Sequence, residues 1–550
     1  MIVIRTYASP SKGIGHLARC RRLANNLNNQ GIEVFFALDY VDDYLQIYLK
    51  NFNCLSIYSW NESFQSEVDD AFRLYKIISN KEVSAVIVDD YRFSKIWERS
   101  IGKLGYKIIV IDDEDKNSHE CHLLIDSIWE GQKTFKRHKD KILKNTVCLL
   151  GPNYLLIDEI YGFSQKPKYK SISKNKKLKI LLSVGGGYHF KLLTNLIYHL
   201  INQLQDNFLY EIAIVVGPYA LNKNELNKYS QNYDNVRLIV NQDGLFNEIC
   251  NADLYIGASG GTLFEALAMN TPCLTFSISE NQKNENEYLE DLGHFFHLNK
   301  IDENDFEKFA ILVFEILSQY DRFNKIYKAA SRFKIDGKGV QRVSEAILSI
   351  ISKKKVKIDS ISLETESKLK TGYDIKEIND FEVNRYFLAN NIKINKDRAI
   401  DTTSISQLNH YIWWLKGRKR TSYILRKNGK DFIYVWHKIK KFENLDVIAS
   451  GWFFADESSN NLDVIYALTE HSKIIKKLFN DFIWLIVIRK NDYFMKKVYK
   501  QLGFLKAEKG SDVERAILDS FPNASNDVLL KYFCRVENNC LNDQLNPKAR

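Results

Sequence analysis

The sequence predicts a multidomain α/β protein in which two doubly wound halves are followed by a third region of α+β type. Three observations support this fold class. Apolar strands alternate with amphipathic helices from Met1 to about Cys148, the alternation begins again at Leu178, and the composition becomes rich in Trp and Tyr from about Thr371. Because the apolar strands are continuous runs, helices should cover both faces of each sheet.

The first half should occupy residues 1–165, followed by a lysine- and serine-rich linker. Its strands are expected at residues 1–4, 33–38, 85–88 and 108–111, and its helices at residues 17–29, 72–78 and 96–104. Polar residues that follow such strands face the ligand-binding edge of the sheet. Asp89-Asp90 and Asp112-Asp113 stand at two such places. Each pair alone could serve as a turn and helix cap, but together with His16 they favour the rim of an active site.

A glycine loop, Gly13-Ile14-Gly15-His16, joins the first strand to the first helix. Glycines allow the backbone to approach a ligand closely, and the helix N-terminus favours an anion. His16 could then act as a base or as a phosphate partner. The alternative is a tight turn with a solvated histidine. The loop is not a dinucleotide fingerprint, because the third glycine is absent.

The second half should occupy residues 178–352. Its strands are expected at residues 178–184, 210–216, 235–240, 254–256 and 273–277, and helices at 310–317 and 340–351 should close it. Gly185-Gly186-Gly187 follows the first of these strands and opens a helix over residues 189–204. Two such halves facing each other would enclose a cleft.

The strongest local pattern is the small-residue loop Ser259-Gly260-Gly261-Thr262, which follows a strand and opens a helix. Its backbone could hold a pyrophosphate at the helix N-terminus. Glu265, one turn into the helix, could accept hydrogen bonds from the two hydroxyls of a ribose. The alternative is that the small residues serve helix packing and Glu265 is a surface charge.

Composition excludes several classes of protein. The net charge of +10 comes largely from short lysine clusters without interleaved aromatic residues, so we expect a solvated surface and no nucleic-acid partner. The eight cysteines form no C-x-x-C pair, and we expect a reducing compartment and no structural zinc. We interpret His119-x-Cys121-His122 as loop and strand residues. No signal-peptide pattern and no run of about 18 apolar residues occurs, so a cytoplasmic protein without membrane contact is expected.

Residues 1 to about 300 resemble the nucleotide-sugar hydrolase of pseudaminic acid biosynthesis, a relative of the MurG-type glycosyltransferases that also includes spore-coat polysaccharide proteins. The motifs that carry the resemblance occur in the family's order and are Arg5 with Ala8-Ser9, Gly13-Ile14-Gly15-His16-Leu17-Ala18-Arg19-Cys20, Val88-Asp89-Asp90-Tyr91, Ile111-Asp112-Asp113, Gly151-Pro152-Asn153-Tyr154, Ser183-Val184-Gly185-Gly186, the 259–265 loop and Glu280-Asn281-Gln282.

The resemblance implies a GT-B-like pair of Rossmann-type domains that removes UDP from UDP-2,4-diacetamido-2,4,6-trideoxy-L-altrose by attack of water at the anomeric carbon. It implies His16 as the catalytic base and no metal or other cofactor. The residues that it implies for substrate and nucleotide binding are Arg5, Gly13, Gly15, Asp89, Asp90, Tyr154, Gly185, Gly186, Ser259, Gly260, Gly261, Thr262, Glu265, Asn281 and Gln282.

Two residues depart from the family pattern. Tyr7 stands where the family usually has an aspartate, and Asp90 stands where it usually has a histidine. Because the base loop and the nucleotide loop are retained, we expect these departures to alter the hexose that is accepted rather than the hydrolytic reaction.

After a polar linker at residues 353–370, residues 371–550 are expected to form the third domain. Helices are expected at residues 404–415, 470–482 and 493–502, and strands at 422–426, 432–437, 447–454, 463–468 and 484–488. This order resembles a GNAT-type N-acetyltransferase. The resemblance implies that Asn491 contacts coenzyme A and that Tyr499 is the general acid. However, Thr469-Glu470-His471-Ser472-Lys473, which should hold the pyrophosphate-binding glycines, contains none. A degenerate docking module is therefore the alternative to an enzyme that uses acetyl-CoA.

The leading hypothesis from sequence is a bifunctional protein that acts on a UDP-amino sugar, alongside other enzymes of the same pathway. The first alternative is a glycosyltransferase of the same architecture, in which an acceptor hydroxyl replaces water. The second is a non-catalytic sugar-nucleotide-binding scaffold.

Overall fold

The computed structural model describes residues 1–10, 13–59, 61–163, 177–186, 190–205, 209–220, 223–240, 242, 244–278, 282, 286–329, 333–358, 372–398, 404–417, 420–525 and 529–536. The chain divides into two compact units, Met1–Glu364 and Thr365–Arg550. Within the described ranges, no helix combines the length and the apolar character needed to span a membrane.

The first sheet has seven parallel strands in the order β3-β2-β1-β4-β5-β6-β7. The strands are β1 Ile2–Thr6, β2 Val34–Leu38, β3 Asn53–Ser56, β4 Ala85–Asp89, β5 Lys107–Ile111, β6 Leu123–Asp126 and β7 Val147–Leu150. The helical segments are α1 Gly15–Asn29, α2 Asp43–Tyr48, α3 Glu67–Ile78, α4 Lys95–Gly102, η1 Lys133–Lys136, η2 Pro152–Tyr154 and α5 Ile160–Phe163.

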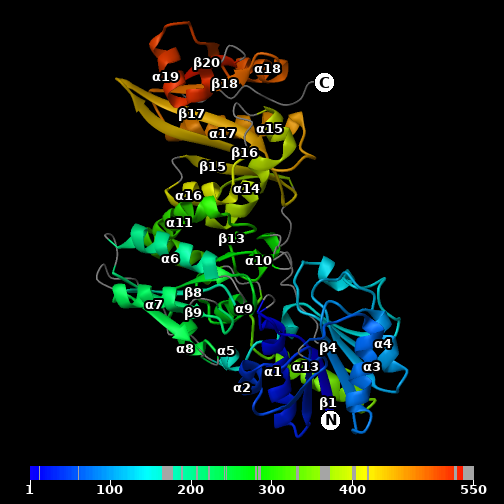
Figure 1. Ribbon diagram of the computed structural model, residues 1–550. Coiled ribbons are helices and arrows are strands. Elements are labelled where there is room, and N and C mark those ends of the chain that lie inside the picture. The colour runs from blue at the N-terminus through cyan, green and yellow to red at the C-terminus, as the bar shows by residue number, and fades with distance from the viewer. Residues whose placement is uncertain are drawn as a thin grey trace. The chain divides into compact units, whose positions relative to one another are not determined.

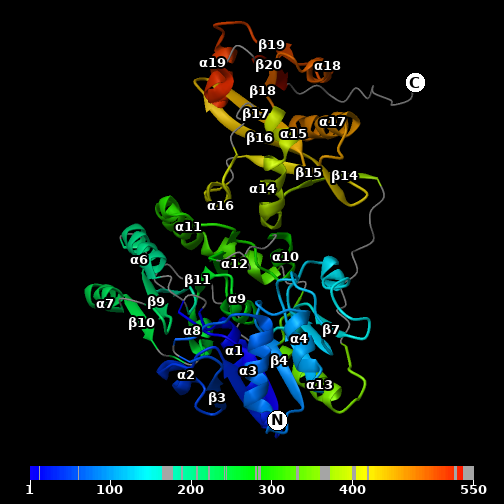
Figure 2. The same ribbon diagram turned by 45° about the vertical axis from the view of Figure 1, so that its right-hand side comes forward.

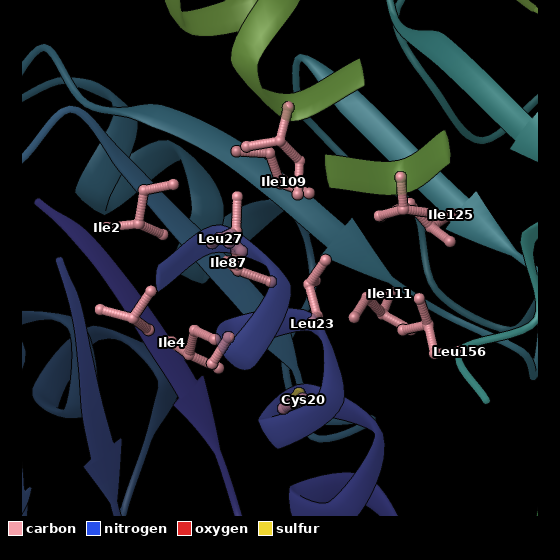
Figure 3. Packing of buried hydrophobic residues seen from close by; sticks show 14 of the residues in the cluster. Ile2, Ile4, Cys20, Leu23, Leu27, Ile87, Ile109, Ile111, Ile125 and Leu156 are labelled. Carbon is pink, nitrogen blue, oxygen red and sulfur yellow. The ribbon is translucent and has the colours of Figure 1, made fainter. Parts of the chain in front are cut away.

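Helices cover both faces of this sheet, as the continuous apolar strands predict (Figure 1). On one face, Leu23 and Leu27 of α1 pack with Ile87 and Ile109 of the strands (Figure 3). On the other face lie α3 and α4. Helix α13 (Gly339–Ile351) was expected to close the second half. It packs instead on the α1 face of the first sheet, where its buried apolar side chains join the same core.

The second sheet has six parallel strands in the order β10-β9-β8-β11-β12-β13. The strands are β8 Leu178–Ser183, β9 Tyr210–Val216, β10 Val236–Val240, β11 Leu254–Ala258, β12 Cys273–Phe276 and β13 His297–Leu298. The helical segments are α6 Phe190–Leu204, α7 Lys223–Asn232, α8 Phe246–Asn251, α9 Gly261–Ala268, α10 Asn286–Asp291, η4 Glu303–Asp305, α11 Phe306–Ser318 and α12 Tyr320–Ala329. In both sheets the strand order reverses beside the first strand, which places a ligand-binding edge there.

The unit Thr365–Arg550 contains a mixed sheet in the order β14-β15-β16-β17-β18-β20-β19. The strands are β14 Tyr373–Glu377, β15 Thr421–Lys427, β16 Lys430–Phe442, β17 Leu445–Phe454, β18 Phe482–Arg489, β19 Leu505–Lys506 and β20 Leu529–Val536. The helical segments are η5 Asp380–Glu382, α14 Val383–Asn391, α15 Lys393–Arg398, α16 Gln407–Leu415, α17 Asn461–Leu478, α18 Tyr493–Gln501, α19 Asp512–Ser520 and η6 Pro522–Ser525. Two parallel-sheet halves followed by an α+β unit confirm the predicted fold class.

The strand expected at residues 463–468 was wrong, because these residues belong to α17, which lies along the sheet (Figure 2). The side chains of Asn460 and Asp463 each accept a hydrogen bond from the other's backbone N–H, and this capping box starts the helix. Val464, Ala467 and Leu468 then face the core at helical spacing. Residues 469–473, where the glycine loop was sought, therefore lie inside the helix. The segment ahead of the helix, residues 455–460, also contains no glycine.

Candidate active site

Three residues meet where the strand order of the first sheet reverses. Thr6 of β1 pairs with Asp89 of β4, so Tyr7, the residue after β1, comes close to Asp89. Helix α1 begins at Gly15 and directs His16 to the same place. The glycine loop and one of the two predicted acidic pairs are thus brought together.

His16 is held at both ring nitrogens. Its Nδ1 lies 2.6 Å from Oδ1 of Asp89, and its Nε2 lies 3.1 Å from the hydroxyl of Tyr7. The carboxylate favours a proton on Nδ1, which leaves Nε2 as the acceptor. The ring of Tyr91 meets the imidazole edge-on at 4.7 Å between centroids. The side chain of His16 remains 14% exposed, so part of the imidazole is open to a bound molecule.

Asp89 lies behind His16, and its side chain is fully buried. Arg19 donates to both carboxylate oxygens, from Nε at 2.7 Å and from Nη2 at 2.6 Å. Cys20 Sγ donates to Oδ2 at 3.2 Å. Burial alone would raise the pKa of Asp89, but the charge of Arg19 and the hydrogen bonds from Arg19 and His16 outweigh it and hold that pKa well below its usual value. Asp89 is therefore an anion that orients the imidazole.

Sequence reasoning gave Arg19 no role, although it lies one helical turn after His16 on the same face of α1. Its Nη1 is also paired with a carboxylate oxygen of Asp113. The signal that could have identified it is this spacing together with the two Asp pairs at neighbouring strand ends.

The two departures from the family pattern, Tyr7 and Asp90, are linked by charge. Burial raises the pKa of the Tyr7 hydroxyl, and the carboxylates of Asp90 and Asp89 raise it further, so the hydroxyl stays protonated. Asp90 is itself buried and paired with Arg92 at 2.5 Å. Arg5 is fully buried and pairs with Asp70 at 2.6 Å, an arrangement that supports an indirect role in shaping this rim.

The glycine loops of the two halves approach each other. Gly13 has a φ of 75° and is bridged to Ser9, and Gly15 opens α1. A Cβ on Gly186 would lie 3.0 Å from Cγ1 of Ile14 in the first loop. Gly185, with a φ of 84°, completes this turn after β8. A side chain at position 186 would therefore fit only if Ile14 moved.

The predicted nucleotide loop follows β11 and opens α9. Its N-cap residue is Gly260, which has no side chain to cap the helix, and the first turn of the helix holds no acidic residue. A Cβ on Gly261 would meet no atom within 4 Å, and Thr262 is half-buried. The backbone carbonyl of Gln282 accepts hydrogen bonds from Ser259 at 3.0 Å and from Ser277 at 2.8 Å. The start of α9 is thus open and suited to an anion.

Glu265 is buried and paired with Arg22 of α1 at 2.5 Å, which ties the two halves together. Burial raises the pKa of Glu265, against the opposing charge of Arg22. The sequence missed this partner because Arg22 and Glu265 lie 243 residues apart. Tyr154 is buried in η2 and joins the core of the first sheet, and Asn281 lies outside the described residues.

A second buried group follows β5. Asp112 accepts from Nε2 of His119 at 2.9 Å, and Nδ1 of His119 lies 2.6 Å from Glu98. Burial lowers the pKa of His119, but the two carboxylates outweigh it and raise that pKa to about 9. In the sequence cluster that includes Cys121, His122 instead accepts a hydrogen bond from the backbone N–H of Ile108 at 3.1 Å.

In the C-terminal unit the two predicted site residues differ in exposure. Asn491 is exposed, between β18 and α18. Tyr499 is only 3% exposed and packs on Phe504 at 5.1 Å between ring centroids. Burial, together with the charge of Asp492, raises the pKa of Tyr499. Trp414 is fully buried, and Trp413 is half-buried beside it.

Comparison with known proteins gives two curated relatives. The uncharacterized protein MJ1062 of Methanocaldococcus jannaschii is 26% identical over 440 residues, which are 78% of this chain and 81% of that protein. The spore coat polysaccharide biosynthesis protein SpsG of Bacillus subtilis is 21% identical over 334 residues, which are 60% of this chain and 93% of that protein. No protein-family model matches the chain.

Solved structures give a weaker likeness. The structure of MnaA from S. aureus with UDP has a TM-score of 0.45 and 14% identity, and it covers 65% of this chain and 100% of its own. This TM-score is below 0.5, so the fold class rests on the sheet topology described above.

Proposed function

We propose that the unit Met1–Glu364 is a UDP-sugar hydrolase that releases UDP from UDP-2,4-diacetamido-2,4,6-trideoxy-L-altrose or a related amino sugar. The observation that carries this proposal is the arrangement of Asp89, His16 and Tyr7, in which an anion orients an imidazole whose Nε2 faces a hydroxyl. Similarity to SpsG, a polysaccharide biosynthesis protein by name, supports a sugar-related substrate.

In the proposed reaction, a water oxygen attacks the anomeric carbon while Nε2 of His16 takes its proton. The bond between that carbon and the diphosphate oxygen breaks, and UDP leaves with the electron pair. Asp89 stabilises the imidazolium that forms, because it is a buried anion on the Nδ1 side. The backbone N–H groups at the start of α9 would stabilise the charge on the leaving diphosphate. This chemistry needs no metal at the reacting carbon.

The experiment that tests the proposal is incubation of the full chain with the UDP-amino sugar in ¹⁸O-labelled water and no acceptor. We expect release of UDP and one ¹⁸O atom on the anomeric carbon of the sugar. Label in the phosphate would place the attack at phosphorus. Release of UDP only after an acceptor alcohol is added would favour the glycosyltransferase alternative, and tight UDP binding without turnover would favour a scaffold.

Tyr7 should position the attacking water, because its hydroxyl already lies at the nitrogen that would take the proton. Replacing Tyr7 with Phe should lower kcat for UDP release about tenfold, the effect of losing one hydrogen bond in the transition state, and change KM little. The matched control is Tyr91→Phe, since that ring also touches His16 while its hydroxyl points to Asp113. A higher kcat in Tyr7→Phe would instead mean that the hydroxyl competes with water for Nε2.

We also propose that the unit Thr365–Arg550 binds acetyl-CoA. The parallel strands β17 and β18 pair only as far as Ala449 and Leu485, although they continue to Phe454 and Arg489. Where two strands separate in this way, backbone N–H and C=O groups between them are available for hydrogen bonds with an extended ligand. We propose that this unit also transfers the acetyl group to an amino group of the sugar, as an N-acetyltransferase.

Calorimetry of the full chain with acetyl-CoA should show one site, weakened about tenfold by Asn491→Ala, the loss expected for one well-placed hydrogen bond. Asn409→Ala, which alters an exposed asparagine on α16, is the control. No heat of binding in the unaltered chain would favour the docking module that lacks pyrophosphate-binding glycines.

A further inference from the structure

A buried cluster of ionisable side chains beside the first sheet has no part in the proposed hydrolysis. Asp112, His119 and His138 are 5%, 4% and 1% exposed. One ligand atom from each lies within 4.8 Å of the other two. Asp112 follows β5 directly, and the two histidines lie in the segments on either side of β6, so the cluster joins segments around this strand pair.

In each histidine, one ring nitrogen contacts a carboxylate behind the ring, and the other ring nitrogen points into the cluster. Nδ1 of His119 lies 2.6 Å from Glu98, and its Nε2 lies 2.9 Å from Asp112. Nε2 of His138 lies 2.9 Å from Asp126. A carboxylate behind each imidazole fixes the ring and its tautomer, as is usual for histidines that bind metal ions.

The inward nitrogen of His138 is the atom that needs a partner. This Nδ1 is buried and makes no hydrogen bond. It lies 3.9 Å from Oδ2 of Asp112 and 3.3 Å from Oδ1 of Asp115. Buried polar atoms are normally paired. A proton on His119 would link Glu98 to Asp112 but would leave Nδ1 of His138 unpaired.

We propose that this cluster binds one divalent transition-metal ion of the zinc class, with His119 Nε2, His138 Nδ1 and Asp112 Oδ2 as ligands. Asp115, whose Oδ1 lies 3.3 Å from Nδ1 of His138, borders these three ligands. Four ligands at about 2.1 Å in a tetrahedron lie about 3.4 Å from one another. The separations of 2.9 Å between His119 Nε2 and Asp112 and of 3.9 Å between His138 Nδ1 and Asp112 lie on both sides of that value.

The charges that face the cluster also favour a dication. The four carboxylates are those of Glu98, Asp112, Asp115 and Asp126, and the cations are Arg137, paired with Asp126 at 2.6 Å, and Lys141, 3.2 Å from Asp115. These carboxylates outnumber the two cations, one of which, Arg137, is also paired with Glu130 at 2.7 Å, so a dication that displaces the proton of His119 meets a net negative site. Because the three ligands are buried, the ion is structural. It would fix Asp112, the neighbour of the Asp113 that pairs with Arg19.

The test uses the full chain after chelation, titrated with Zn²⁺ against a chromophoric chelator and with Co²⁺ by visible absorption. We expect one equivalent of metal per chain, a tetrahedral Co²⁺ spectrum without a thiolate band, and a higher Tm with metal bound. His138→Asn should weaken binding at least tenfold. Asparagine suits this position because the backbone of His138 has a φ of 61°, which asparagine tolerates.

The control variant is His199→Asn, a half-buried histidine on α6 outside the cluster, which should bind metal normally. Asp115→Asn provides a second variant on the more exposed side of the site, and it should also weaken binding. The proposal would be overturned if the unaltered chain did not bind one equivalent of metal, or if the cluster variants bound metal as tightly as the unaltered chain. A thiolate band from cysteine ligation would also overturn it. None of these readouts depends on UDP release.

Discussion

Replacing His16 with Gln should lower kcat for UDP release by about 10²–10⁴-fold, the usual contribution of a positioned general base. Glutamine keeps a polar side chain at the start of α1 but cannot take a proton at neutral pH. KM should change little, because the diphosphate is proposed to bind at α9 in the second half. Steady-state release of UDP from the amino sugar, measured at several substrate concentrations, separates the two parameters.

His199→Gln serves as the matched control, since this histidine lies on α6 and contacts Phe306 rather than the site residues. Its kinetics should equal those of the unaltered chain. If His16→Gln released UDP at the normal rate, His16 would not be the base, even though the hydrolase itself would stand. The two conclusions are therefore tested separately.

The strands and the loops at their ends could be predicted from the sequence because they are local patterns. Continuous apolar runs marked β4 and β5, and the glycines placed His16 at the start of a helix. Which side chains meet could not be predicted in the same way. Asp89 was expected to touch substrate, whereas in the structure it is fully buried against His16 and Arg19. That difference depends on the pairing of β1 with β4, which no local pattern specifies.

Two other differences have identifiable physical causes. Helix α13 has the amphipathic pattern of any surface helix, and the pattern does not say which sheet its apolar face covers. In α17, Val464 and Ile465 are β-branched residues of the kind that are common in strands. The capping box of Asn460 and Asp463, which is a local signal, was overlooked.

The cluster that contains His119 and His138 shows a third reason why side-chain contacts could not be predicted from the sequence. The sequence places His119 near Cys121 and His122, whereas in the structure its imidazole contacts Glu98 and Asp112. His138 lies 19 positions later, and the carboxylates Glu98 and Asp126 behind the two imidazoles come from different elements. These side chains meet through tertiary packing that includes the pairing of β5 with β6, which no local pattern specifies.

Replacing Asp89 with Asn should lower kcat for UDP release by about 10²–10⁴-fold while leaving the chain folded. The amide removes the negative charge that stabilises the imidazolium and no longer favours a proton on Nδ1 of His16. It also leaves Arg19 with one carboxylate partner, Asp113. If Asp89 acts through His16, the double variant with His16→Gln should be no slower than His16→Gln alone. Multiplying effects would mean that Asp89 has a separate role.

The same substitution has a signature in stability that does not depend on turnover. The pKa of Asp89 is held well below its usual value in the folded chain, so its charge stabilises the fold above the unfolded pKa of about 3.9 and this contribution is lost as the pH falls. The free energy of unfolding of Asp89→Asn should therefore be lower than that of the unaltered chain at neutral pH. The difference between the two free energies should shrink as the pH falls. Urea unfolding followed from pH 7 down to pH 3 measures this. A constant difference across that range would mean that Asp89 is not charged in the fold, and the orientation of His16 by an anion would have to be abandoned.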